Sequence, residues 1–160
     1  MADLHVKIVG LDVVRSRLRA LPLRLRTNIM RGGLRAAARV VQIASRQEAP
    51  RGKTGNLRRS ISVSTRSKLG GAVVEAKVKA GGRRAWYANI VESGAKPHRI
   101  EARRGKALQI GPAFVASVQH PGFAGRGFMA KARERSAVPA NLAFQRYVDQ
   151  RIATFWNTGK

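Results

Sequence analysis

The longest regular pattern in this sequence runs from Pro22 to Ala49, where polar and apolar side chains repeat every 3.6 residues. On a helical wheel that turns by about 100° per residue, the polar positions gather in a sector of roughly 90° and the apolar positions lie opposite. Proline suits the first helical turn and Pro50 ends the run, so the pattern predicts one long amphipathic helix. Gly32 and Gly33 lower helix propensity by about 2 kcal/mol relative to alanine, which allows a kink or break there. The polar side is an arginine stripe made of Arg24, Asn28, Arg31, Arg35, Arg39, Gln42 and Arg46.

Alternation of apolar and polar residues predicts short strands on both sides of this helix. Residues 60–66 and 72–80 are joined by a glycine-containing turn, and we expect them to pair as an antiparallel hairpin with Val63 and Val78 facing inward. Farther along, two short strands flank the basic turn 103–106. The predicted strands cover residues 4–9, 60–66, 72–80, 98–102, 106–111 and 113–120.

Further helices are predicted at 11–22, at 83–94 and over 128–156, the last with a boundary at Pro139. This order of elements predicts an α+β fold in which an antiparallel β-sheet packs against one long amphipathic helix and a C-terminal helix. Since no internal repeat and no linker divides the chain, residues 1–160 are expected to form a single domain.

The charge balance is the most unusual property of the composition. The chain has 32 Lys and Arg against 8 Asp and Glu, a net charge of +24, although 44% of its residues are hydrophobic. Such a surface attracts polyanions, whether nucleic acid, an anionic membrane or an acidic protein. The absence of cysteine excludes disulfides and thiolate metal sites. We find no signal-peptide pattern and no apolar run near the ~18 residues of a membrane helix, so a soluble cytoplasmic protein is expected.

Few residues are placed for catalysis or metal binding. The acidic residues are scattered, and Glu92, His98 and Glu101 form the one local group, in which an ion pair of Glu92 with an arginine is the plainer interpretation. His98 and His120 could meet across two strands with Glu101 as a third ligand, but the spacing matches no metal-ligand motif. Gln47 stands where the segment "RGKTG" would need the first glycine of a phosphate-binding loop. We therefore expect no enzyme activity, no metal and no cofactor.

A nucleic-acid-binding function stays open because of the charge. No reader motif is recognised, so any contact is expected to be with phosphates and not with bases. Trp86, Tyr87, Phe144 and Trp156 sit at helix-core spacing, and we expect them in the core and not on a base-stacking surface. The arginine stripe is either a solvated helix face or a face apposed to DNA or to an acidic neighbouring subunit.

Four motifs then occur in a recognisable order: "GLDVVRSRLRALP" at 10–22, "EAPRGKTGNLRRSI" at 48–61, "WYANIVESGAKPHRI" at 86–100 and "VQHPGFAGRGFMAKA" at 118–132. Together they resemble a family of small tail-completion or head–tail joining proteins of tailed phages, of the minor tail protein Z type. The family pattern "AP..TG.L..SI", "YA..VE.G...H.I" and "HPG....PF...A" is met here, except that Gly127 stands where the family usually has a proline.

This resemblance implies a virion protein of the neck or tail, assembled in the host cytoplasm into a homo-oligomeric ring, with a hexamer matching the tail symmetry. The ring would contact the tail tube protein and a head-side connector protein, and would let double-stranded DNA pass without sequence specificity and without a membrane. Residues 96–123 would form a β-hairpin arm that reaches a neighbouring subunit, and Glu92 would be an ion-pairing residue at a helix end.

Two other functions are weighed against this one. The alternative is a basic protein that binds nucleic acid without sequence specificity, whereas a small hydrolase or toxin would need a nucleophile–base pair that is not visible. Most of the arginine stripe is expected to face subunits or outer solvent, with a minority of basic residues lining a DNA channel. The candidate subunit- or DNA-contacting residues are Arg31, Arg35, Arg39, Arg46, Arg103, Arg104 and Lys106.

Overall fold

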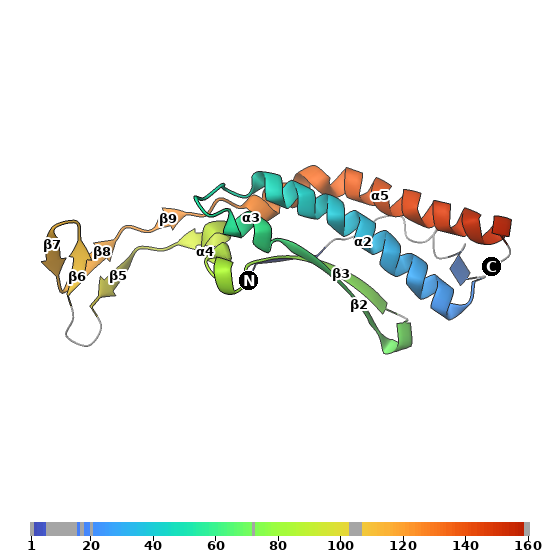
Figure 1. The fold of residues 1–160 in the computed structure, drawn as a ribbon, viewed down its shortest axis with the longest axis horizontal. Helices are drawn as coiled ribbons and strands as arrows, with labels where there is room; N and C mark the ends of the chain where they lie inside the picture. Colours follow the sequence, from blue (N-terminus) through green and yellow to red (C-terminus); the bar gives the residue numbers. More distant parts are fainter. Residues whose placement is uncertain are drawn as a thin grey trace.

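The protein is elongated, with a helix pair and a small sheet at one end and a thin arm at the other (Figure 1). Helix α2 is the middle layer of the body, with helix α5 against one side and the sheet against the other. This arrangement confirms the α+β class. The structure, a computed structural model, describes residues 2–5, 16, 18–19, 21–71, 73–102 and 107–158.

Helix α2 spans Leu23–Glu48 and confirms the predicted long helix. It continues through Gly32 and Gly33 without a break, because α5 packs closely there. A Cβ atom on Gly33 would lie 2.9 Å from the Phe144 ring, and one on Gly32 would overlap the Tyr147 ring. The two glycines therefore let two helices approach each other, and this contact outweighs their low helix propensity.

Helix α5 spans Phe128–Thr158 and runs antiparallel to α2 (Figure 1). The predicted boundary at Pro139 is wrong, since Pro139 lies inside the continuous helix. Its ring is exposed, so the carbonyl that loses its partner lies on the solvent side and can bond water. Buried Ser136, Ala140 and Phe144 pack against the core on both sides of the proline and hold the helix together.

Strands β1 (Ala2–His5), β2 (Ser62–Lys68) and β3 (Val73–Ala80) form an antiparallel sheet in the order β1-β3-β2. Pairing of β2 with β3 confirms the predicted hairpin. Val78 is buried, Val63 packs against the core, and both face α2 as expected. Strand β1 overlaps the first predicted strand, while residues 6–15, which hold the rest of it and half of the predicted 11–22 helix, lie outside the described residues.

Two short helices complete the body. Helix α3 spans Asn56–Ser60, and buried Leu57 anchors it. Helix α4, Ala88–Ser93, ends at Gly94 as predicted and follows a short 3-10 helix, η2, at Arg83–Ala85. A second 3-10 turn, η1 at Leu69–Gly71, joins β2 to β3.

Residues 94–102 and 107–127 form the arm, a chain of short two-stranded ribbons that leads away from the body (Figure 1). Its strands pair as β4 with β9, β5 with β8 and β6 with β7, all antiparallel. The two strands that flank turn 103–106, β5 and β6, do not pair with each other, since β5 pairs with the returning strand β8 and β6 with β7. The strands span Gly94–Ala95 (β4), His98–Glu101 (β5), Leu108–Ile110 (β6), Ala113–Val115 (β7), Ser117–His120 (β8) and Phe123–Ala124 (β9).

Candidate assembly surfaces

The arm has no core of its own. None of its described residues, 94–102 and 107–127, is buried. Ile110, Phe114 and Phe123 are 48%, 69% and 49% exposed. A two-stranded ribbon is only marginally stable by itself in water. The arm therefore presents apolar side chains that nothing in the described part of this subunit covers.

The ribbon of β5 and β8 has two unlike faces. Ile100 stands opposite Val118, and His98 stands opposite His120, on one face. The two imidazole rings stack with their centroids 5.1 Å apart. The other face is polar and carries Arg99, whose Nε lies 3.2 Å from Oε1 of Glu101. An apolar face on a ribbon without a core is suited to contact with another molecule.

Both histidines of the arm are held by nearby backbone groups. Nδ1 of His98 lies 2.8 Å from the carbonyl oxygen of Lys96, and Nδ1 of His120 accepts a hydrogen bond from the N–H of Gly122 at 3.0 Å. In the parts of the chain that the structure describes, no three potential ligand side chains gather in a way that could hold a metal ion. The two histidines thus meet across two strands, as the sequence allowed, and each is held by a backbone group within two residues of it.

The root of the arm is tightly built. A Cβ atom on Gly94 would lie 2.4 Å from the carbonyl oxygen of Phe123, and one on Gly122 would lie 2.4 Å from that of Ala95. The N–H groups of Arg126 and Gly127 donate to the carbonyl groups of α4 at 2.9 and 3.1 Å. The arm is therefore fixed to the body where it leaves α4 and where it re-enters at α5.

Glu92 has a role that differs from the expected ion pair. Its carboxylate accepts hydrogen bonds from the backbone N–H groups of Met129 at 2.9 Å and Ala130 at 3.1 Å. These are donors in the first turn of α5 that have no partner inside the helix, and a negative charge is favourable there. Glu92 therefore caps α5 and ties α4 to it. A sequence pattern can identify a capping residue that lies next to the first turn of a helix. Glu92 is 37 residues before Met129, so no pattern near the start of α5 identifies it.

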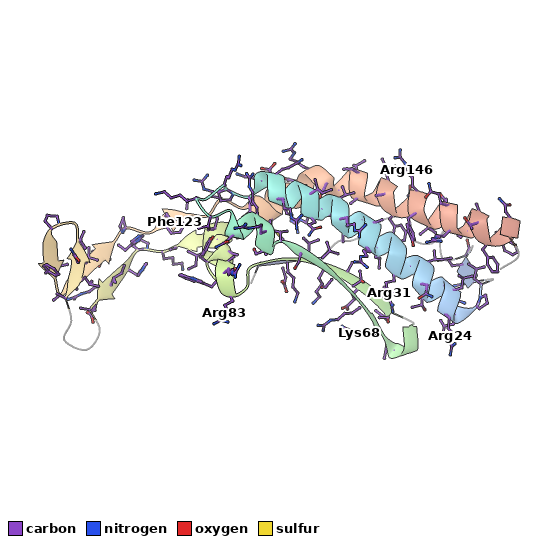
Figure 2. The ribbon with its side chains drawn as sticks, in the orientation of Figure 1. Arg24, Arg31, Lys68, Arg83, Phe123 and Arg146 are labelled. Atoms are coloured by element: carbon purple, nitrogen blue, oxygen red, sulfur yellow. The ribbon has the colours of Figure 1, made fainter. Side chains whose placement is uncertain are left out.

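The arginine stripe of α2 divides into two groups. Arg31 donates to Oγ of Ser67 at 2.7 Å, and Arg46 donates to the carbonyl oxygen of Ile61 at 2.9 Å, so both bind the neighbouring β2 region. Arg35 and Arg39 are exposed. Arg103, Arg104 and Lys106 lie outside the described residues. Figure 2 shows how the labelled basic side chains are spread, with Arg146 projecting from α5 on the side opposite Lys68 and Arg83.

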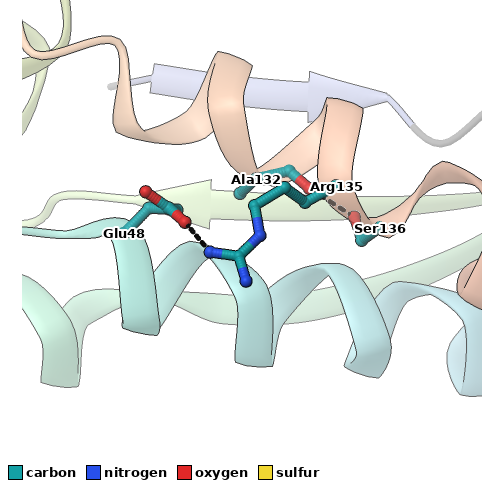
Figure 3. A network of polar contacts seen from close by, with 4 residues as sticks. All are labelled: Glu48, Ala132, Arg135 and Ser136. Atoms are coloured by element: carbon teal, nitrogen blue, oxygen red, sulfur yellow. Dashed lines mark hydrogen bonds and ion pairs between the residues drawn. The ribbon is translucent and has the colours of Figure 1, made fainter.

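Several of the 8 acidic residues already bind other groups of the same subunit. Glu48 of α2 forms an ion pair with Arg135 of α5 (Figure 3). Oε1 of Glu75 lies 3.0 Å from Nζ of Lys68. With Glu92 capping α5 and Glu101 next to Arg99, these carboxylates have partners within the subunit and are not gathered into an acidic surface.

Two of the four aromatic residues expected in the core are at the surface. Phe144 is fully buried and Tyr87 packs against the core, as expected. Trp86 and Trp156 are 73% and 63% exposed, so that expectation was wrong for both. Trp86 stacks edge-on against Tyr87, and Trp156 against Phe155. Helical spacing does not distinguish an aromatic that faces the core from one that faces a partner.

Comparison with known families gives one match. Residues 14–94, which are 81 of the 160 residues, match the model of the HK97-gp10-like family, described as "Bacteriophage HK97-gp10, putative tail-component". The match begins within the predicted 11–22 helix and ends at Gly94, directly after α4. Neither the curated proteins nor the solved structures that we compared gave a match. Among the described residues, no helix is both long and apolar enough to cross a bilayer.

Proposed function

Since the chain belongs to the HK97-gp10-like family of bacteriophage tail components, we propose that it forms a ring at the head-proximal end of the tail. It is a structural protein of the virion, and the ring completes the tail and joins it to the head. Its partners are further copies of itself, in a hexamer, together with the tail tube protein and a connector protein on the head side. Double-stranded DNA passes the ring without sequence-specific contacts. Assembly takes place in the host cytoplasm and involves association without a chemical step.

The observation that carries this proposal is the uncovered arm. Its described residues are all at least partly exposed, although it carries Ile100, Ile110, Phe114 and Val118. Burying a large apolar side chain contributes about 1.5–3 kcal/mol. Contact with a neighbour would therefore stabilise both the arm and the assembly.

The shape of the subunit suits a closed ring. The arm lies at one end and the body at the other (Figure 1), which would let the arm of one subunit contact the body of the next. Contacts between unlike surfaces repeat head to tail and produce a ring when the rotation closes. The tightly built root around Gly94 and Gly122 fixes the direction of the arm, which a closing rotation requires.

The charge opposes assembly at low salt. Subunits of net charge +24 repel each other, and the acidic groups described above are engaged within the fold. The Debye length falls from about 30 Å at 0.01 M salt to about 8 Å at physiological salt, so added salt weakens this repulsion. Ring formation through apolar arm contacts should therefore increase as salt rises from very low levels.

The test is electron microscopy of the purified protein combined with size-exclusion chromatography over a salt series, with and without short duplex DNA. We expect rings without DNA, in a yield that grows with salt. Rings that form only with DNA and dissolve as salt rises would contradict the proposal. That outcome would favour the alternative, a basic protein that binds nucleic acid without sequence specificity.

A further inference from the structure

The outer face of the three-stranded sheet is a second surface of unusual character. Along β3, Val74, Ala76 and Val78 turn toward α2, so Glu75, Lys77 and Lys79 lie on the opposite face. Each of these lysines stands opposite a serine of β2, with Lys77 paired to Ser64 and Lys79 to Ser62. The strand period thus places cations and small hydroxyl side chains together on a face turned away from the core.

These side chains surround a hollow of about 80 Å³. Glu75 is bound by Lys68 at 3.0 Å, and Asp3 of β1 stands opposite Lys79 in the strand register. Within the described part of the chain, Lys77 and Lys79 themselves form no ion pair. The hollow is lined by Ser64, Arg66, Lys68, Glu75, Lys77 and Lys79.

The positive charge continues beyond the hollow. Residues 51–91 contain ten Lys and Arg and a single acidic residue, Glu75. Lys68 and Arg83 project from the same side of the molecule (Figure 2). Next to η2, Trp86 is exposed on the surface. Lys68 and Arg83 thus extend the positive charge of the sheet face along one side of the molecule.

We propose that the outer face of this sheet binds the phosphate backbone of double-stranded DNA, with Lys77 and Lys79 as the principal contacts. This inference rests on the part of the proposed function in which DNA passes the assembly, and it assigns the contact to the sheet and not to the arginine stripe of α2. Lysine and serine side chains are common phosphate ligands. Lysine is depleted in protein interfaces, whose buried centres are apolar, and the hollow is lined by charged and hydroxyl side chains. DNA therefore fits this face better than an acidic protein does.

The spacing of the two lysines also suits DNA. Residues two apart on one face of a strand are separated by about 6.7 Å. One strand of duplex DNA carries a phosphate for about every 3.4 Å of axial rise. The lysine pair thus spans an axial rise of about two nucleotides and can reach two phosphates of one strand whatever the base sequence.

The test is a fluorescence anisotropy titration of a labelled short duplex with the full-length protein, repeated between about 50 and 200 mM salt, where phosphate contacts set the slope. The double variant Lys77→Gln/Lys79→Gln should lower the magnitude of the slope of log K against log salt by about 1.8, since each phosphate contact contributes about 0.9. The matched control, Arg35→Gln/Arg39→Gln, removes the same charge from the exposed side of α2 and should leave the slope unchanged. Equal losses in both variants, or no change in the sheet variant, would overturn the assignment.

Three further measurements complete the test. Ser64→Arg adds a cation beside the hollow and should raise the magnitude of the slope by about 0.9, and an unchanged slope would count against the proposal. Polyglutamate of matched charge should compete poorly with the labelled duplex, and binding as tight as that of DNA would overturn the choice of partner.

Ring formation, followed in parallel by electron microscopy, should be retained in the lysine variant. Loss of DNA binding with rings intact supports this inference, whereas absence of rings in the wild type contradicts the proposed function alone.

Discussion

The helix pair and the arm both contain large apolar side chains, and they differ in what lies against those side chains. In the body, Phe144 of α5 is fully buried against Gly33 of α2. In the arm, Phe114 of β7 is 69% exposed and no described residue of the arm is buried. The body thus contains the interactions that make one subunit stable, whereas the arm carries apolar side chains that the described part of the subunit leaves uncovered.

Glycines allow close packing in both the body and the arm, but against different kinds of group. Gly33 lets a helix and an aromatic ring come together, which builds a core. Gly94 and Gly122 let two strands cross closely at the root of the arm, which fixes a direction without creating a core. The arm is consequently well anchored at its root but uncovered along its length.

Removing one phenylalanine from each region tests whether the body and the arm contribute differently to the stability of the subunit, and the largest effect is expected here. Phe144→Ala should lower the free energy of unfolding of the subunit by about 3–5 kcal/mol, because it removes a fully buried ring and leaves a cavity. The matched variant Phe114→Ala should change it by less than about 0.5 kcal/mol, since that ring is mainly exposed. Urea denaturation followed by circular dichroism measures both. Similar losses in the two variants would contradict the distinction between body and arm.

A smaller effect is expected from closing the gap between α2 and α5. Gly33→Ala gains about 1 kcal/mol in helix propensity, but its methyl group would lie 2.9 Å from the Phe144 ring. Overpacking of a tight core usually costs about 1–3 kcal/mol, so a net loss of stability is expected. Gly52→Ala serves as the control because its new methyl group meets nothing within 4 Å. A Gly33→Ala protein that is more stable than the wild type would show that the helices can separate at little cost.

The smallest of these effects concerns the link between arm and body. Glu92→Ala removes the cap of α5 and should destabilise the subunit by about 1 kcal/mol. Glu101→Ala removes an acidic residue from an exposed ion pair in the arm, for which less than about 0.5 kcal/mol is expected. Thermal unfolding of the two variants under the same conditions compares them. Equal decreases in the melting temperature of the two variants would indicate that Glu92 stabilises the protein only through its charge and not as the cap of α5.

The elements that follow from local periodicity were predicted well from the sequence. The 3.6-residue pattern gave α2 to within one residue at each end, and alternation gave β2 and β3. Errors arose where distant contacts decide the outcome. Pro139 was expected to end a helix, but packing of Ala140 and Phe144 keeps α5 continuous.

In the candidate assembly surfaces, too, the sequence-based predictions failed where contacts between distant residues decide the structure. Strands β5 and β6 were predicted, whereas the predicted strand 113–120 is divided into β7 and β8, and β4 and β9 were missed. Alternation also does not specify which strand pairs with which. Trp86 and Trp156 were expected in the core, since exposed and buried aromatics can share helical spacing. The basic turn 103–106 lies outside the described residues, so Arg103, Arg104 and Lys106 stay predictions.

Replacing the arm by a tight turn tests directly whether the arm joins the subunits. Ala95 and Phe123 are paired in β4 and β9, so residues 96–122 can be replaced by Asn-Gly, which favours a two-residue hairpin. Because the body contains the core and the Glu92 cap, the shortened protein should keep its fold. In sedimentation-velocity runs at the same salt and concentration, the full-length protein should sediment as a ring and the shortened one as a monomer. Rings of the same size from the shortened protein would contradict the claim that the arm joins the subunits.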